Sequence, residues 1–390
     1  MQTILTSAID TAQRAECAYT KFITPNDTGT TGGHQGGFHI HKDAWQLFFD
    51  TPGVKGANKD EWLTITWQGD FTTESRAIYY GVGTRNEYRL TRFGRSFPYL
   101  TDDNVGDLLV LCRMPGQDYR AFVLRTDEDI DDFFAALNIS PANANGIISL
   151  SRQIPPEAGL EGCFHAFLDS LISGFPDTAQ LSRQARDCYR AAYRVTDRMI
   201  TREPDREILR WLQAEFELFQ LIENDRYSQR IQQPFSTVQE LIQTANTLLQ
   251  RRKSRAGFSL EHHLTELFRI FGLRFDALGI TEGRTRPDLI FPGTAAYHDP
   301  SFDTGKLFVL AAKTTCKDRW RQVTTEADRV STTHLFTLQE GISKSQLQEM
   351  YESGVCLVVP KEHLTSFPAE FRDRILTLEG FIRLIQDSQQ

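Results

Sequence analysis

The sequence predicts a protein of two domains, an N-terminal β-barrel or sandwich followed by a C-terminal α/β domain. The first part of the chain is rich in glycine, aromatic residues and short alternating runs, which are typical of strands and turns. From Leu181 onward the pattern changes to long runs with helical spacing, followed by short apolar segments. The chain has 390 residues, which is enough for two or three domains with cores of their own.

We place the domain boundary in the segment 173–178, where Gly174 and Pro176 lie close together and interrupt regular structure. This division gives an N-terminal domain of residues 1–174 and a C-terminal domain of residues 175–390. The sequence shows neither an internal repeat nor a low-complexity segment.

The N-terminal domain contains several segments with the alternation of β-strands. Strands are predicted over residues 62–67, 73–80, 107–112 and 119–124. Pro115 and Gly116 predict a turn that joins the last two. An acidic run over 127–134 predicts the start of a helix. Many short strands with few helices are typical of a barrel or a sandwich.

The C-terminal domain combines helical patterns with short apolar strands. Helices are predicted over residues 206–221, 238–249 and 258–273, where apolar side chains recur with helical spacing. Strands are predicted over residues 288–291, 306–312 and 355–359. This mixture predicts an α/β architecture for the second half of the chain.

The composition excludes several classes of protein. The hydrophobic fraction of 40% and the charged fraction of 24% are ordinary for a soluble globular protein, and no apolar run approaches the ~20 residues of a membrane span. The N-terminus lacks the pattern of a secretory signal. Six cysteines are scattered without paired spacing, which argues against a zinc cluster or a disulfide framework and favours a reducing cytoplasm. A small-molecule enzyme on an α/β fold is a further alternative, but we find no glycine-rich phosphate loop or nucleophile elbow to support it. Neither an organic cofactor nor a membrane partner is expected.

The charge distribution is uneven along the chain. The formal net charge is -8, but binding to a nucleic acid depends on local patches of charge. Basic residues form three clusters: Arg85, Arg89, Arg92 and Arg95; Arg251, Arg252, Lys253 and Arg255; and Lys317, Arg319 and Arg321. Each cluster alone is compatible with a solvated surface, whereas three of them beside a catalytic pattern favour nucleic-acid binding.

Three residues of the C-terminal domain carry the strongest chemical signal. Asp288 follows Pro287 at the start of a predicted strand, Lys313 ends the apolar run 307–312, and Glu326 lies further along. Two carboxylates can hold a hard divalent cation such as Mg²⁺. A lysine beside that cation can orient or deprotonate a water molecule, or neutralise charge at a phosphate. This equipment predicts a metal-dependent phosphodiesterase, and therefore a nuclease.

The order of a helix, a Pro-Asp strand and a strand ending in lysine resembles the PD-(D/E)xK nucleases. This sequence departs from their pattern at Ala311, where an acidic residue is expected two positions before Lys313. Glu326 is the natural substitute, and such a migrated acid resembles the restriction endonucleases that recognise CC-GG-type sites. The segments 284–293, 311–323 and 335–343 resemble those of EcoRII-type restriction endonucleases.

The resemblance implies roles for individual residues of the C-terminal domain. Asp288, Lys313 and Glu326 would be catalytic, with Asp288 and Glu326 binding Mg²⁺. Glu261 matches an acid that often supports this site, either as a metal ligand or as a neighbouring acid. Lys317, Asp318 and Arg319 lie where related enzymes read bases. Their chemistry suits that role, because Lys and Arg donate to guanine and Asp accepts from cytosine.

The N-terminal domain holds two segments rich in hydrogen-bond donors, residues 34–42 and 87–95. The second segment resembles the effector domain of the EcoRII family, a β-pseudobarrel that binds DNA. The resemblance implies an N-terminal β-pseudobarrel effector domain and a C-terminal α/β restriction-endonuclease-like catalytic domain. The residues that it implies for DNA binding by the effector domain are His34, Glu87, Tyr88, Arg89, Arg92 and Arg95.

Taken together, these features predict a type II restriction endonuclease from a bacterial or archaeal cytoplasm. The family implies Mg²⁺-dependent cleavage of double-stranded DNA at a CCWGG-like site, a homodimer formed through a helical segment of the catalytic domain, and autoinhibition by an effector domain that binds a second site. One alternative is a catalytically silent, sequence-specific DNA-binding regulator, which the missing acid at Ala311 would suit. Another is a different PD-(D/E)xK nuclease, although the run 317–319 favours an enzyme that reads sequence.

Overall fold

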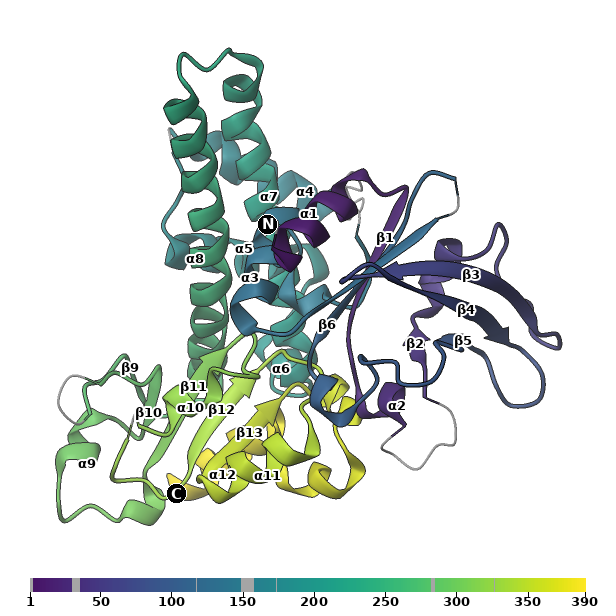
Figure 1. The fold of residues 1–390 in the computed structure, drawn as a ribbon. Coiled ribbons are helices and arrows are strands. Elements are labelled where there is room, and N and C mark those ends of the chain that lie inside the picture. Colours follow the sequence, from purple (N-terminus) through teal and green to yellow (C-terminus); the bar gives the residue numbers. More distant parts are fainter. Residues whose placement is uncertain are drawn as a thin grey trace.

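The computed structural model shows a β-rich N-terminal domain beside an α/β domain from which a long helical hairpin extends (Figure 1). The structure describes residues 3–29, 36–116, 118–148, 158–172, 174–281, 285–325 and 327–390. The two halves lie against each other, with the helix α3 (Asp127–Leu137) of the N-terminal half placed between them (Figure 1). This arrangement matches the two-domain organisation that the sequence predicts.

The N-terminal domain is built on one eight-stranded sheet with the strand order β2-β5-β4-β3-β7-β6-β1-β8. Its strands are β1 (Cys17–Phe22), β2 (Phe38–Ile40), β3 (Lys59–Trp67), β4 (Phe71–Tyr80), β5 (Glu87–Thr91), β6 (Leu108–Arg113), β7 (Tyr119–Leu124) and β8 (Gly146–Ile148). The four strands predicted from the sequence correspond to β3, β4, β6 and β7, and are confirmed. β3 and β7 are parallel, whereas their other neighbours are antiparallel.

The sheet separates two apolar layers. One face encloses an aromatic core in which Phe38, Trp67, Phe93 and Phe97 pack edge to face or stacked. The 3-10 helix η1 (Lys42–Leu47) contacts β1, β5 and β8 and closes this side in a barrel-like manner. The helices α1 (Ile4–Arg14) and α3 (Asp127–Leu137) cover the other face. The helix predicted at the acidic run is therefore α3.

The C-terminal domain contains a six-stranded sheet with the order β14-β13-β12-β11-β10-β9. Its strands are β9 (Asp276–Ala277), β10 (Leu289–Phe291), β11 (Phe308–Lys313), β12 (Thr333–Thr337), β13 (Val355–Val359) and β14 (Leu376–Thr377). Strands β11 to β14 run parallel, and β9 and β10 pair antiparallel at one edge. Separate apolar clusters cover the two faces, as a largely parallel sheet requires.

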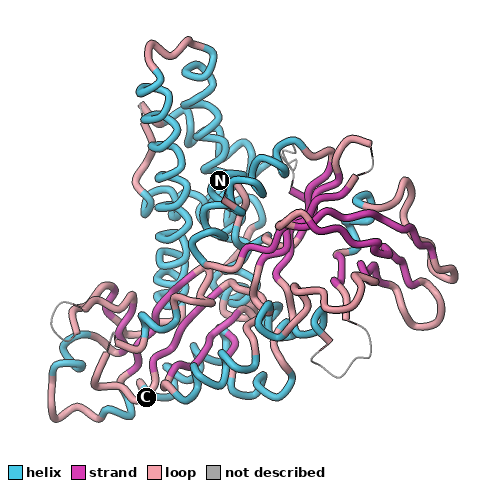
Figure 2. Tube along the Cα trace, in the orientation of Figure 1, coloured by secondary structure: helices cyan, strands magenta, loops and turns pink. Residues whose placement is uncertain are grey.

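Helices complete both domains and form the hairpin. They are α2 (Pro25–Thr28), α4 (Ala158–Ser170), α5 (Thr178–Tyr193), α6 (Asp197–Ile200), α7 (Pro204–Gln232), α8 (Val238–Ile270), α9 (Thr294–His298), α10 (Trp320–Val323), α11 (Lys344–Glu352) and α12 (Leu378–Ser388). Short 3-10 helices are η2 (Asp102–Asn104), η3 (Pro141–Asn143), η4 (Thr304–Lys306), η5 (Lys361–Ser366) and η6 (Ala369–Arg374). The antiparallel helices α7 and α8 rise out of the body as a long hairpin (Figure 2).

Two predicted helices, 238–249 and 258–273, are one continuous helix, α8. The predicted separation of these two helices was wrong: α8 continues through Gly257, although a glycine inside a helix costs about 1 kcal/mol relative to alanine. Packing offsets this cost, because the buried Arg255 lies over the rings of Phe216 and Phe219 on α7. Tertiary contacts thus override the local preference.

The segment around the predicted domain boundary packs differently from the expectation. Leu160, Phe164 and Phe167 of α4 belong to the core that α5, α7 and α8 share, although α4 precedes residue 174. A division ahead of α4 therefore fits the packing better than one at residue 174. Cys163 and Cys188 form a disulfide between α4 and α5. The expectation of unpaired cysteines was wrong for these two, because helix packing and not sequence spacing brings them together.

In the part of the chain that the structure describes, no helix has both the length and the apolar character that crossing a bilayer requires.

The packing predicts a large contribution of the Phe291 side chain to the stability of the C-terminal domain. Phe291 is fully buried on β10, with ring centroids 5.3 Å from Phe268 and 5.7 Å from Phe381. Phe291→Ala should lower the free energy of unfolding by about 3–5 kcal/mol, because it opens a cavity between the sheet and two helices. Urea unfolding followed by circular dichroism measures this. The matched change Phe258→Ala removes a ring that is 45% exposed, so an equal loss there would contradict the argument.

Candidate active site and nucleic-acid interface

The pairing of β10 with β11 brings Asp288 and Lys313 together. Asp288 lies immediately before β10, and Leu289 pairs with Leu310 in the antiparallel register. The Asp288 Oδ2 atom accepts a hydrogen bond from the backbone N–H of Ala312 at 2.7 Å. The Lys313 Nζ atom donates to the same oxygen at 3.3 Å. The strands therefore fix a carboxylate and an ammonium group side by side, and both remain partly exposed.

Glu261 extends this pair from the neighbouring helix α8, which contacts β11. Burial raises the pKa of Glu261 to about 7, the negative charge of Asp288 adds to this, and Lys313 opposes it. Glu261, Ala312 and Lys313 line one cavity with a volume of about 620 Å³. The three charged groups therefore form one electrostatic unit at the edge of the sheet.

The chemistry of these side chains fits a hard divalent cation. Asp288 and Glu261 supply carboxylate oxygens, the ligands that Mg²⁺ prefers, and a cation would relieve the repulsion between them. Glu326, the third acid of the prediction, lies outside the described residues. Within the described part of the chain, no group of three or more His, Cys, Asp or Glu side chains is arranged to hold a metal ion.

The turn 317–319, which holds the predicted base-reading residues, follows β11 and leads into α10. Lys317 is only 7% exposed: its Nζ atom contacts the carboxylate of Asp107 and donates to the carbonyl oxygen of Asp103 at 3.0 Å. Arg319 donates to the carboxylate of Asp131 at 2.7 Å. The structure thus brings these residues close to Lys313, but acids of the N-terminal domain bind the side chains of Lys317 and Arg319.

Asp127, the first residue of α3, makes the central contact between the domains. Its carboxylate accepts hydrogen bonds from the backbone N–H groups of Lys317 (3.1 Å), Asp318 (2.9 Å) and Arg319 (3.1 Å). In return, the Asp318 Oδ1 atom accepts from the backbone N–H of Asp127 at 3.3 Å. Burial raises the pKa of Asp127 to about 6, and the hydrogen bond and charge of Asp318 add to this. Each domain therefore supplies a carboxylate that accepts hydrogen bonds from the backbone of the other domain.

The C-terminal end of α3 is held by the hairpin. Arg252 donates to the carbonyl oxygens of Ala135 (2.8 Å) and Ala136 (3.3 Å), where a cation also suits the helix dipole. The Arg252 Nε atom donates to Glu223 at 2.8 Å. Lys253 pairs with Asp132. We use the term closed interface for the contacts of α3 and Asp107 with the 317–319 turn, Arg252 and Lys253.

The closed interface forms one wall of the cavity at Lys313, because Asp127, Asp131 and Asp132 line it together with Glu261 and Lys313. Sequence reasoning identified the acidic run as a helix but did not assign it a partner. The signal was present in the charges, because an acidic run and a basic run such as 317–321 attract each other.

The predicted contacts of the effector domain differ in exposure. Arg92 and Arg95 are exposed, and Arg92 has a positive φ of 69° at the end of β5. Arg89 is half-buried, with its Nε atom 3.4 Å from Glu87. Tyr88 is 4% exposed and its hydroxyl accepts from the Gly53 N–H at 2.6 Å, so the structure gives it a packing position. His34 lies outside the described residues.

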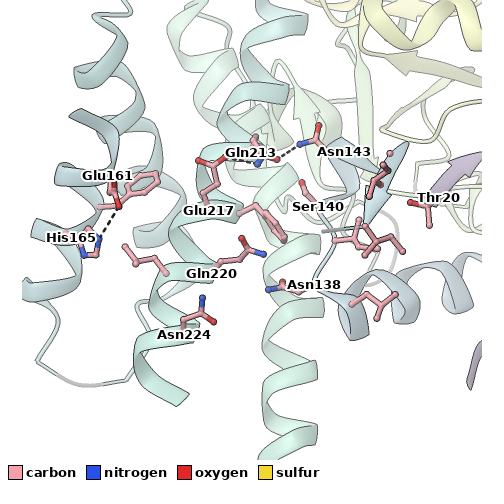
Figure 3. Close-up of a pocket in the computed structure, with 18 residues that line it drawn as sticks. Thr20, Asn138, Ser140, Asn143, Glu161, His165, Gln213, Glu217, Gln220 and Asn224 are labelled. Carbon is pink, nitrogen blue, oxygen red and sulfur yellow. Dashed lines mark hydrogen bonds and ion pairs between the residues drawn. The ribbon is translucent and has the colours of Figure 1, made fainter. Parts of the chain in front are cut away.

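A second cavity of about 470 Å³ lies between the N-terminal domain and the helices α4 and α7 (Figure 3). Gln213 links Asn143 to Glu217 there, donating to the Glu217 carboxylate at 2.8 Å. Among the described residues, neither Asp288 nor Lys313 lines this cavity, whereas Lys313 lines the cavity of about 620 Å³.

Comparisons with known proteins identify both halves of the chain. Residues 12–145 match the model described as "Restriction endonuclease EcoRII, N-terminal", and residues 219–382 match "EcoRII C terminal". The type II restriction enzyme EcoRII of Escherichia coli is 36% identical over 387 residues, covering 93% of this chain and 92% of that enzyme. The type II restriction enzyme SsoII of Shigella sonnei is 29% identical over 145 residues, covering 34% of this chain and 46% of that enzyme.

Two solved structures match part of this chain. Metal-depleted Ecl18kI in complex with uncleaved DNA has a TM-score of 0.45 and 22% identity, covering 58% of this chain and 84% of that one. The complex of the restriction endonuclease PspGI with substrate DNA has a TM-score of 0.45 and 16% identity, covering 55% and 93%.

The sequence matches confirm the predicted effector domain and the predicted catalytic domain. Sequence identity at this level over nearly the full length of both chains shows the family to which the protein belongs. It belongs to the EcoRII family of type II restriction endonucleases, and is a site-specific deoxyribonuclease.

Proposed function

We propose that this enzyme hydrolyses double-stranded DNA at a CCWGG-like site with Mg²⁺, and that its effector domain holds it closed until it binds a second copy of the site. The target follows the resemblance to EcoRII. The observation that carries the autoinhibition is the closed interface, in which Lys317, Arg319 and the backbone of their turn bind carboxylates of the N-terminal domain. Those groups are then unavailable to DNA.

The catalytic roles follow from the chemistry of the site. Asp288 and Glu261, with Glu326, would hold Mg²⁺, which supplies charge neutralisation at the phosphate and a water of lowered pKa when bound. Lys313 is held by Asp288 at the rim of the cavity, where its ammonium group can donate to a phosphate oxygen or orient the attacking water. The backbone N–H of Ala312 fixes Asp288 so that its second oxygen stays free for a cation.

The 317–319 turn would recognise the bases of the DNA target. Lys317 and Arg319 can donate to guanine O6 and N7, and Asp318 can accept from cytosine N4. In the closed interface Lys317 is buried against Asp107, so its ammonium group reaches a base only after the two domains separate. The effector domain therefore blocks recognition and access to the catalytic lysine at the same time.

The remaining assignments concern assembly and the effector site. The exposed Arg92 and Arg95, with Arg89 and Glu87, are proposed as contacts to the second DNA site. Cleavage of both strands suits a homodimer, and apolar side chains exposed near the tip of the hairpin, Ile231, Val238, Leu241 and Ile242, support a helical dimer contact. A bacterial or archaeal cytoplasm is the compartment in which such an enzyme meets its DNA.

The first of three predictions from the proposed function concerns the catalytic pair. Lys313→Met and Asp288→Asn should each lower the rate of Mg²⁺-dependent cleavage of a plasmid with several CCWGG sites by a factor of about 10² or more, because they remove the ammonium group and the ligand that it accompanies. DNA binding, measured by fluorescence anisotropy, should persist. Lys344→Met is the matched control, since Lys344 pairs with Glu370 away from the cavity. Cleavage by Lys313→Met at the wild-type rate would show that Lys313 is not a catalytic residue.

The second prediction concerns the closed interface. Asp107→Asn and Asp131→Asn should raise cleavage of a single-site plasmid in the absence of effector DNA, about tenfold for every ~1.4 kcal/mol by which they weaken the closed form. Each removes the partner of a base-reading cation. Asp60→Asn is the matched control, because its partner Arg76 lies in the same domain. If the two interface variants cut no faster than Asp60→Asn, these contacts do not restrain the enzyme.

The third prediction concerns pH. The pKa of Asp127 in the closed interface is about 6, above its ordinary value of 3.8, so closing binds a proton between about pH 4 and 6. Burial shifts the pKa of Asp107 and Asp131 in the same direction. For Asp318, burial raises the pKa, but hydrogen bonds with Asp127 outweigh this and the net shift is downward. Raising the pH through 6 should therefore weaken the closed form.

Cleavage of a single-site plasmid with and without effector duplex, from pH 5.5 to 7.5, measures this effect. The stimulation by the duplex should shrink as the pH rises, and Asp127→Asn should flatten most of that slope. Taking the ratio of the two rates removes the pH dependence of hydrolysis itself. Stimulation that grows with pH in the wild-type enzyme would contradict the assignment to Asp127.

A further inference from the structure

A buried ion pair lies in the effector domain, apart from the contacts of the proposed catalytic and base-reading residues. Lys21 on β1 is 5% exposed and Asp27 on α2 is fully buried. The Lys21 Nζ atom donates to both oxygens of Asp27, at 2.8 and 2.7 Å, and to the carbonyl oxygen of His39 at 3.0 Å. Burying two charges costs free energy, so such a pair adds little stability but fixes the geometry of the groups that satisfy it.

Asp27 joins two segments that are separated in the chain. Its carboxylate accepts from the backbone N–H of Thr24 at 2.8 Å and from that of His39 at 2.7 Å. Its carbonyl oxygen accepts from the Gly37 N–H at 2.8 Å. β2 has three residues and lies at the edge of the sheet, with β5 as its sheet neighbour. A strand this short is weakly held by pairing alone, so the ion pair fixes its position.

The position of β2 bears on the proposed effector contacts. His39 pairs with Arg89 in the register of β2 and β5, and Ile40 pairs with Tyr88. The His39 Nε2 atom lies 3.8 Å from Glu87, whose carboxylate also lies 3.4 Å from the Arg89 Nε atom. The strand that carries Glu87 and Arg89 therefore rests on the strand that Lys21 and Asp27 hold.

The segment 21–24 also contacts the part of the chain that holds Asp107 of the closed interface. The Ile23 N–H donates to the carbonyl oxygen of Asp107 at 2.8 Å, and the Gly106 N–H donates to that of Ile23 at 2.8 Å. Asp107 contacts Lys317. Gly106 has a φ of 89°, and a Cβ atom added to it would lie 2.8 Å from Gln339 and from Gly341 of the catalytic domain. Two backbone hydrogen bonds therefore connect Ile23 to the segment that contacts the catalytic domain.

We propose that the Lys21–Asp27 pair is the positioning element that sets β2 and β5 for effector DNA and, through Ile23, links bound DNA to the Asp107–Lys317 contact. This inference rests on the proposed autoinhibition. Neither residue touches DNA or the reacting phosphate. DNA that displaces the β2–β5 pair moves the segment 21–24, and this movement strains the bonds that keep Asp107 on Lys317.

The test uses the full-length enzyme carrying Lys21→Met together with Asp27→Asn. Neutral groups of similar size replace the pair, a change that buried ion pairs often tolerate. Cleavage of a single-site plasmid is measured with increasing concentrations of an uncleavable CCWGG duplex. Cleavage without duplex should match that of the wild type, because Asp107 and Lys317 are intact, whereas the maximal stimulation should fall about tenfold or more. The matched control is Asp60→Asn with Arg76→Met, which removes a more exposed ion pair of the same domain.

Addition of Asp107→Asn separates positioning from misfolding. It should restore the fast, duplex-independent cleavage that Asp107→Asn alone shows, because it releases Lys317 directly. If Asp107→Asn alone cleaves fast but the combined variant does not, the pair only supports folding and the inference is overturned. Stimulation of the Lys21→Met/Asp27→Asn enzyme equal to that of the wild type would overturn it as well, with autoinhibition intact. A wild-type enzyme that the duplex does not stimulate would remove both the autoinhibition and this inference.

Discussion

The arrangement of the two domains depends on one carboxylate, that of Asp127, which accepts three backbone hydrogen bonds from the 317–319 turn. Backbone N–H groups have to be satisfied when they are buried, so the turn keeps its shape only while an acceptor fills it. In this structure the acceptor comes from the other domain. The flanking contacts of Asp107 and Asp131 add charge to the same surface. The closed form is thus specified by hydrogen bonds to backbone as much as by ion pairs.

Chain geometry explains how one contact would restrain both of the proposed activities, DNA recognition and hydrolysis. Lys313 ends β11 and the proposed reading turn begins four residues later, so both lie at the same edge of the sheet. Asp288 reaches this edge from β10 because the antiparallel register places it beside Ala312. A helix laid across the edge covers the cavity at Lys313 and the turn together. Separate devices for blocking recognition and hydrolysis are unnecessary in such an arrangement.

The sequence predicted what depends on local pattern. The strands that carry Asp288 and Lys313, the strand pair β6–β7 and the helix at Asp127 follow from apolar periodicity and turn residues. What it did not predict depends on contacts between distant segments: the pairing of Cys163 with Cys188, the burial of Tyr88, and the partner of the acidic run. Side-chain character was correct there, but a single sequence does not state which surfaces meet.

The charge pattern of the closed interface also explains how it can be reversible. Burying the cations Lys317 and Arg319 costs free energy unless an acceptor is present. When the domains separate, water or another acceptor can bind these two side chains. The proposed substrate offers such acceptors in guanine edges and phosphate oxygens. Opening then exchanges one set of hydrogen bonds for another instead of losing them. Under the proposed autoinhibition, the free-energy difference between the closed and DNA-bound forms would therefore be smaller than the number of contacts suggests, which is the condition under which binding at a second site can decide between them.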